Sequence, residues 1–145
     1  MSRFTNIKVD HIWQDNELVI ELSPNQYGAL SLELTLLVES LTSVLLLELS
    51  DDSTIALSIH DELGDYEHRA KVTKLKHNKT AFEMSPSQTE YLQATLLRNY
   101  RDGISAVGHV HIEGLFQQRD FDLTVMFASY AEPMSEDDAR KLLDS

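Results

Sequence analysis

The chain has 145 residues and a formal net charge of −12, with 24 Asp and Glu against 12 Lys and Arg, and it contains no cysteine. This length fits one domain whose core is large enough to fold without cross-links. The lack of thiols excludes disulfides, zinc–thiolate sites and thiol catalysis. The acidic balance argues against nucleic acid as a partner, because phosphate binding needs clustered cations. No apolar run approaches a membrane span or a secretory signal, so we expect a cytoplasmic protein with no membrane partner.

The first segment of the chain has the pattern of a hairpin followed by a capped element. Phe4–Trp13 and Glu17–Leu22 alternate as strands do, and the residues between them have turn composition. Residues 23–26 (SPNQ) then have the form of a helix capping box. Tyr27–Leu41 fits a helical apolar stripe, but its leucines also alternate with polar residues as in a strand. The capping box favours the helix, and the strand stays open as the alternative.

The middle of the chain has the pattern of two further hairpins and a second helix. The expected strands are Val44–Leu49, Thr54–Ile59, Arg69–Leu75 and Thr80–Met84. Residues 61–65 are polar and too few for a domain linker. A second capping box, residues 85–88 (SPSQ), predicts a helix that begins at Pro86.

The last part of the chain predicts a closing hairpin and a short helix. Val107–Glu113 and Phe121–Phe127 are the expected strands, with the turn near residues 116–117. Ser135 followed by three acidic residues has the form of a helix N-terminus, so Ala139–Leu143 is expected to be helical.

The two halves of the chain resemble each other when the second is shifted by 62 residues. The SPNQ and SPSQ boxes then superimpose, together with Asn16 on Asn78 and Leu30 on Leu92. The pattern predicts a duplicated hairpin–helix–hairpin unit, with halves at about 3–60 and 66–130 in one domain spanning 1–145. The expected class is therefore α+β, with antiparallel sheets and the helices packed on one face.

A group of metal-ligating side chains falls on the first strand of the closing hairpin. His109, His111 and Glu113 alternate, so they share one face of that strand. The expected turn places His111 opposite Asp122 and Glu113 opposite Asp120. His109, His111, Glu113 and Asp122 form a candidate site for a divalent transition metal such as zinc, iron or manganese. The alternative is that the imidazoles cover a solvated sheet face and pair with Asp122 or Glu113.

The basic residues are concentrated on one hairpin, at Arg69, Lys71, Lys74, Lys76 and Lys79. No aromatic residue is interleaved with them as a stacking platform. An exposed hairpin whose lysines discourage edge-to-edge pairing is the favoured interpretation.

The acidic residues are concentrated in the first half, where no Lys or Arg occurs from Val9 through His68. One interpretation is solubility, and the sharper one is a docking face for a basic protein. The residues expected to bind that partner are Glu33, Asp51, Asp52, Asp61 and Glu62. The function expected from this pattern is a non-enzymatic interaction module without a cofactor, in its most concrete form a bacterial immunity or antitoxin protein. A metal-binding protein or metal-dependent enzyme is the alternative, and a homodimer is compatible with exposed sheet edges.

Overall fold

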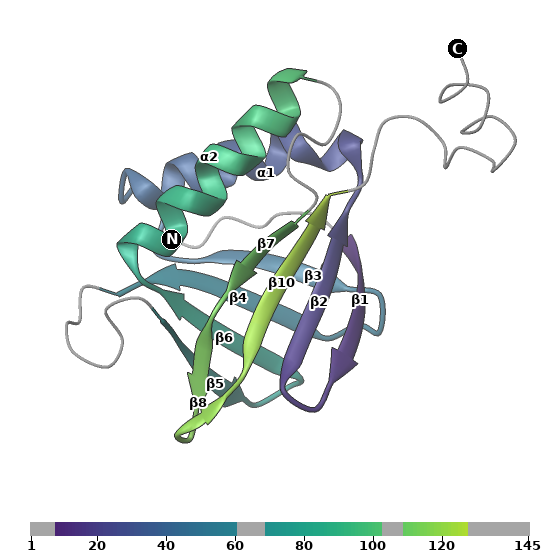
Figure 1. Ribbon diagram of the computed structural model, residues 1–145, viewed down its shortest axis with the longest axis vertical. Coiled ribbons are helices and arrows are strands. Elements are labelled where there is room, and N and C mark those ends of the chain that lie inside the picture. The colour runs from purple at the N-terminus through teal and green to yellow at the C-terminus, as the bar shows by residue number, and fades with distance from the viewer. Residues whose placement is uncertain (1–7, 61–68, 103–108, 128–145) are drawn as a thin grey trace, which may run out of the picture.

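The computed structural model describes residues 8–60, 69–102 and 109–127, which form a mixed α+β arrangement of one large sheet and two helices (Figure 1). The first half contributes β1 (Lys8–Gln14), β2 (Glu17–Leu22), α1 (Pro24–Val38), β3 (Leu45–Leu49) and β4 (Thr54–Ile59). The second half contributes β5 (Ala70–Leu75), β6 (Lys79–Met84), α2 (Pro86–Asp102), β7 (His109–Ile112), β8 (Gly114–Phe116), β9 (Arg119–Asp120) and β10 (Asp122–Phe127). The expected α+β class is confirmed.

The segment that fitted both helix and strand is the helix α1, so the preference drawn from its capping box is confirmed. The helix ends at Val38 rather than Leu41. Ser40 adopts a left-handed φ of 59°, and the Leu41 N–H donates to the carbonyl of Leu36 at 2.9 Å. Both features belong to the geometry that closes a helix.

Each helix begins with a capping box whose glutamine also donates a hydrogen bond to a residue of the sheet region. At α2 the Ser85 N–H donates to Gln88 Oε1 at 3.0 Å, and the Gln88 N–H donates to Ser85 Oγ at 3.2 Å. The Gln88 side-chain amide then donates to the carbonyl of Glu113 at 2.8 Å. At α1, Gln26 donates in the same way to the carbonyl of Lys8 at 2.7 Å. The two capping boxes therefore fix where the helices meet the sheet as well as where they begin.

The sheet is mixed, and the expectation of antiparallel sheets is wrong in this respect. Its strand order is β7-β10-β2-β1-β3-β4-β6-β5-β8-β9. The hairpins are antiparallel, but they are joined through parallel pairs: β1 with β3, β4 with β6, β2 with β10 and β5 with β8. A helix after a hairpin carries the chain back across the sheet, so the next strand can run parallel to the first.

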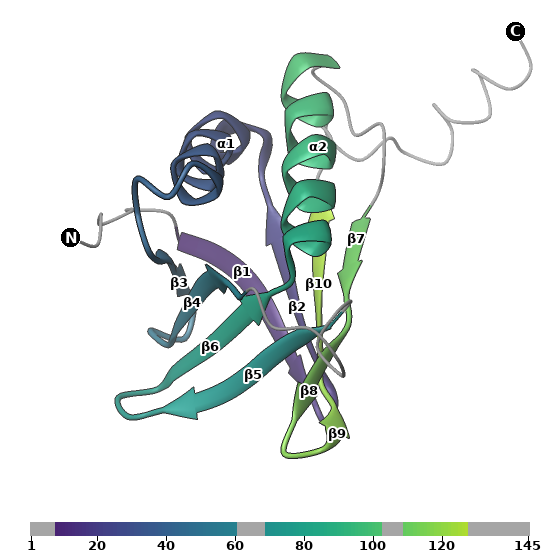
Figure 2. The same cartoon turned by 90° about the vertical axis from the view of Figure 1, so that its left-hand side faces the viewer.

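The sheet is curled, and one long hairpin contributes strands to both of its ends. β7 lies at one end of the strand order and β8 near the other, yet only Glu113 separates them in the sequence. In both views the helices lie together on one side, and the turns of the β5–β6 and β8–β9 hairpins lie on the other (Figures 1 and 2). We call that second side the open end of the sheet.

The core fills the inside of the curled sheet and continues under the helices. It takes alternate residues from the strands and the residues spaced three or four apart on α1 and α2, as their periods dictate. Its largest fully buried side chains include Tyr27, Phe82, Leu34 and Leu92. The stripe on α1 passes through position 33, so Glu33 is buried too, at 8% exposure.

The closing hairpin turns one residue later than expected. Gln117 and Gln118 both have positive φ, 51° and 68°, as a two-residue turn that matches the sheet twist requires. The register therefore shifts by two, and His111 faces Thr124 instead of Asp122. Leu115, rather than Glu113, faces Asp120.

Two of the expected features lie outside the described residues: the connector at 61–65 and the final helix at Ala139–Leu143. In the parts of the chain that the structure describes, neither helix has the length and apolar character needed to cross a membrane.

Candidate functional site

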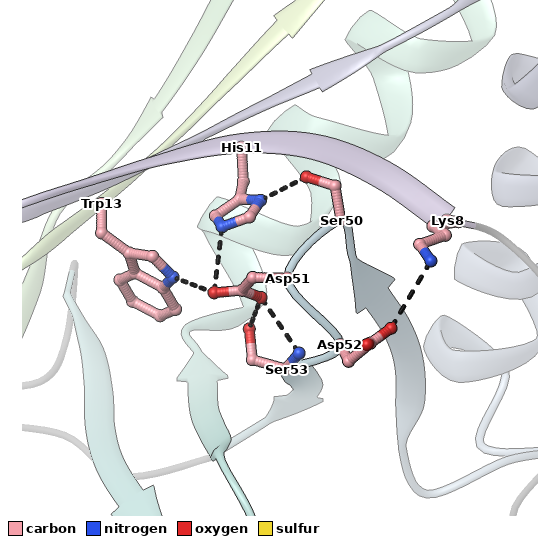
Figure 3. Close-up of polar contacts among 7 residues, drawn as sticks. All are labelled: Lys8, His11, Trp13, Ser50, Asp51, Asp52 and Ser53. Carbon is pink, nitrogen blue, oxygen red and sulfur yellow. Dashed lines mark hydrogen bonds and ion pairs between the residues drawn. The ribbon is translucent and has the colours of Figure 1, made fainter.

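The acidic residues expected to bind a partner do not lie together. Glu33 is buried on α1, so it is not a surface residue. Asp51 and Asp52 occupy the turn between β3 and β4, where they point in different directions (Figure 3). Asp61 and Glu62 lie outside the described residues.

A different acidic surface lies on the outer face of the sheet. Asp10 on β1 stands directly opposite Glu21 on β2, and both side chains are exposed. Met126 on β10 is the next residue in the same row, beyond Glu21, and is 37% exposed. Ile12, two residues after Asp10 on β1, is 61% exposed. Glu48 adds a further exposed carboxylate on β3.

We call this surface the acidic sheet face, defined by Asp10, Ile12, Glu21, Glu48 and Met126. The alternating pattern of the first hairpin is enough to predict this surface. A turn at Asp15 and Asn16 sets the register that brings Asp10 opposite Glu21, and both fall at outward positions. The acidic residues that the sequence suggested as partner-binding lie in expected turns and in a helix, so they do not include Asp10 and Glu21.

Asp51 points toward β1 and anchors the β3–β4 turn to that strand (Figure 3). Its Oδ1 accepts hydrogen bonds from the N–H of Ser53 at 3.0 Å and from the Ser53 hydroxyl. Its Oδ2 accepts from Trp13 Nε1 at 3.2 Å and lies 3.2 Å from His11 Nε2. Because these donors favour the charged carboxylate, they bind the turn to the strand.

Ser50, His11 and Asp51 form a hydrogen-bonded series with the residue types of a nucleophile, a base and an orienting acid. His11 Nδ1 lies 2.7 Å from Ser50 Oγ, and its Nε2 faces Asp51. Both ring nitrogens are thus engaged, and only 10% of the His11 side chain is exposed. His11 thereby ties Ser50 and Asp51 to β1, so the series anchors the β3–β4 turn to that strand.

The hydrogen-bond donors around Asp51 also lower the pKa of its carboxyl group. The Ser53 hydroxyl and N–H, followed by Trp13 and His11, lower the pKa of the Asp51 carboxyl from 3.8 to about 2, against a smaller opposing effect of burial. A folded-state pKa below the unfolded value stabilises the fold above pH 4, and this stabilisation is lost as the pH falls toward 2.

Asp51→Asn is expected to lower the free energy of unfolding by about 1 kcal/mol near neutral pH, a modest value because the carboxylate is 44% exposed. The difference from the wild type should shrink toward zero as the pH falls from 3.8 to about 2. Urea unfolding of both proteins across that range measures it. Asp52→Asn is the control, because Asp52 is 90% exposed and has one ion pair, to Lys8 at 3.5 Å. A loss of stability in Asp51→Asn that does not depend on pH would contradict the view that the charged Asp51 carboxylate stabilises the fold.

The two histidines of the candidate metal site differ in their contacts. His111 Nε2 lies 3.0 Å from Asp122 Oδ2, and its Nδ1 lies 3.0 Å from the hydroxyl of Thr124. His109 and Glu113 are exposed on the same face of the strand. Among the described residues no three His, Asp or Glu side chains are grouped closely enough to hold a metal ion. The geometry matches the alternative, in which His111 pairs with Asp122 on a solvated face.

The basic hairpin lies against aromatic side chains that come from other strands. Lys71 faces outward, whereas Lys74 is on the inner face of β5, in line with the buried Ala70 and Val72. Its ammonium nitrogen lies over the ring of Trp13. β5 is paired with β6 from Lys71 to Leu75, but with β8 only at Ala70 and Lys71, so the part of the strand that carries Lys74 pairs on one side only.

No protein-family model, curated protein or solved structure matches the chain. Its function therefore has to be argued from its own residues.

Proposed function

We propose that this protein is a non-enzymatic interaction module whose acidic sheet face binds a basic protein. The observation that carries the proposal is the pair of exposed carboxylates Asp10 and Glu21, directly opposite each other on neighbouring strands. Like charges in this position destabilise a sheet. The pair nevertheless gives this face a negative potential, which attracts a positively charged partner.

The neighbours of this pair define the chemistry of the partner. Ile12 and Met126 are exposed apolar side chains within the same face: Ile12 follows Asp10 along β1, and Met126 lies opposite Glu21. Glu48 lies opposite Lys8 at the start of β1. An apolar contact supplies affinity when it is buried, while surrounding charges supply selectivity and a fast encounter. The fitting partner presents an apolar side chain flanked by Lys or Arg.

A bacterial immunity or antitoxin protein that neutralises a basic toxin is the most concrete form of this function. Electrostatic attraction allows the fast capture that such a role needs. Two acidic sheet faces repel each other, so a homodimer would have to use another surface. The metal-binding alternative stays a prediction, and the hydrogen bonds that engage both nitrogens of His111 argue against it.

The test is purification of the tagged protein from its own host, in parallel with the double variant Asp10→Lys, Glu21→Lys. We expect a basic polypeptide to copurify in stoichiometric amount with the wild type and to be absent from the double variant. Equal recovery with both proteins, or no basic polypeptide with either, contradicts the proposal.

We also propose that the chain arose by duplication of a hairpin–helix–hairpin unit. The strand pairing supports this origin: β1 runs parallel to β3 as β5 does to β8, and β2 runs parallel to β10 as β6 does to β4. A chain made of two copies of the second half should then fold cooperatively when followed by circular dichroism. A chain of that kind that stays unfolded counts against the proposal.

A further inference from the structure

The open end of the sheet gathers residues from strands that are far apart in the sequence. Trp13 comes from the end of β1, Lys74 from β5 and Phe116 from β8, and Phe121 lies between β9 and β10. All four side chains belong to the inward-facing rows of the sheet. The turns of the β5–β6 and β8–β9 hairpins lie at the end away from the helices (Figure 2).

The ammonium group of Lys74 lies among three aromatic rings. Its Nζ is 5.3 Å from the ring centroid of Trp13, 5.5 Å from that of Phe121 and 6.0 Å from that of Phe116. Contacts of this kind hold a lysine in place, but they leave its positive charge in full. The rings therefore position Lys74 for a further partner that carries negative charge.

The carboxylates nearby do not satisfy this charge. Within the described ranges Lys74 has no ion pair with Asp or Glu. Asp51 is already held by Ser53, Trp13 and His11. Asp15 and Asp120 are exposed acids on the rim.

Two hollows open beside Lys74, and the lysine lines both of them. One has a volume of about 450 Å³ and is also lined by Trp13, His77 and Lys79. The other has a volume of about 710 Å³ and is also lined by Phe116 and Arg119. Both volumes lie within the range of small-molecule sites. Each hollow thus combines an aromatic wall with a cation besides Lys74. Asp51 also lines the first hollow, and Asp15 and Asp120 line the second.

We propose that the open end of the sheet binds a small aromatic anion, with its ring against Trp13 and its phosphate or carboxylate on Lys74 Nζ. A planar ring can contact the part of the indole that stays exposed beside Lys74, and the anion meets an ammonium that the aromatic rings already hold in position. This site is separate from the acidic sheet face, because Trp13 and Lys74 face inward whereas Asp10 and Glu21 face outward.

Trp13 makes this proposal directly testable, because it is the single tryptophan of the chain. Its indole N–H resonance in a proton–nitrogen NMR correlation spectrum reports on the site alone. The probes are AMP and benzoate, each with its neutral counterpart, adenosine or benzamide. We expect saturable shifts of the indole resonance with at least one anion, and at least about tenfold weaker binding of the matching neutral compound.

The variant Lys74→Met keeps the side-chain stem against the rings and removes the charge. It should weaken binding of the anion by about tenfold or more. Lys76→Met removes the same charge from the turn of the same hairpin, lines neither hollow, and should leave binding unchanged. Phe116→Leu provides a second variant that weakens the site if Lys74→Met fails to fold.

Which anion binds distinguishes a phosphate site from a carboxylate site. The proposal is overturned if neither anion shifts the indole resonance, or if the neutral compounds bind as well as the anions. Equal weakening by Lys74→Met and Lys76→Met also overturns it, because general charge attraction would then account for binding.

Discussion

Replacing Gly114 with alanine is expected to lower the free energy of unfolding by about 3 kcal/mol, at the upper end of overpacking costs. A Cβ at this position would lie 2.3 Å from the carbonyl oxygen of Phe121 and 2.9 Å from Val72 Cγ2. The first of these atoms is backbone, so the strands themselves must separate to make room. Gly114 lies where the chain passes from β7 to β8, the point at which one hairpin joins both ends of the sheet.

The hydrogen bonds around Gly114 explain why the strands cannot separate cheaply. The Phe121 N–H donates to the Gly114 carbonyl at 3.0 Å, and the Gly114 N–H donates to Asp122 Oδ1 at 3.1 Å. On the other side the residue pairs with Ala70 of β5. A shift that relieves the clash therefore disturbs pairing on both sides of the strand.

Gly28→Ala is the matched control, measured alongside Gly114→Ala by urea unfolding. Its Cβ would lie 2.9 Å from the ring of Tyr100, which is 53% exposed and can swing outward. The gain of about 1 kcal/mol in helix propensity offsets that movement, so we expect a net change below about 1 kcal/mol. If Gly114→Ala cost no more than Gly28→Ala, the proposed role of Gly114 in closing the sheet would be wrong.

The double variant Asp10→Lys, Glu21→Lys is expected to weaken binding of the basic partner by about 100-fold or more. It replaces attraction by repulsion at the centre of the acidic sheet face. The fold should be unaffected within about 0.5 kcal/mol, because one pair of like charges replaces another at exposed positions. Titration calorimetry with the purified partner measures the affinity, and urea unfolding measures the stability.

Glu39→Lys with Glu90→Lys is the control for this variant. Both residues are exposed, one at the end of α1 and one on α2, away from the acidic sheet face. The two double variants change the net charge equally. We expect the control to weaken binding less than about tenfold, through long-range attraction that salt screens. If the two double variants weakened binding alike, net charge rather than the acidic sheet face would be the cause.

Local features of this fold could be predicted from the sequence because their causes are local. The capping boxes at Ser23 and Ser85 fix the helix starts, and alternation gives the positions of the strands. The buried side of α1 follows from the helical period, which passes through Leu30, Glu33 and Leu37. The charge of Glu33 favours the surface, but its position in this period places it among the buried residues.

Pairing between hairpins could not be predicted in the same way, because alternation does not say which strands become neighbours. The parallel pairs β2–β10 and β4–β6 join segments far apart in the sequence. The sequence places the closing turn one residue too early, because neither Gln117 nor Gln118 is the Gly, Asn or Asp that usually marks positive φ.

The surroundings of Lys74 depend entirely on this long-range pairing. No Phe, Tyr or Trp is interleaved with the lysines from Lys71 to Lys79, and Trp13, Phe116 and Phe121 reach Lys74 only because the sheet curls. The acidic sheet face is the opposite case. Asp10 and Glu21 belong to one hairpin with a recognisable turn, so sequence reasoning could have found them.

Native mass spectrometry of the protein purified gently from its own host tests the central proposal most directly, because one spectrum reports bound polypeptides, metal and oligomeric state together. The account predicts a stoichiometric complex with a basic polypeptide, which is lost in Asp10→Lys, Glu21→Lys and kept in Glu39→Lys, Glu90→Lys. A protein found without any polypeptide partner, carrying one transition-metal ion that His111→Ala removes, would contradict it.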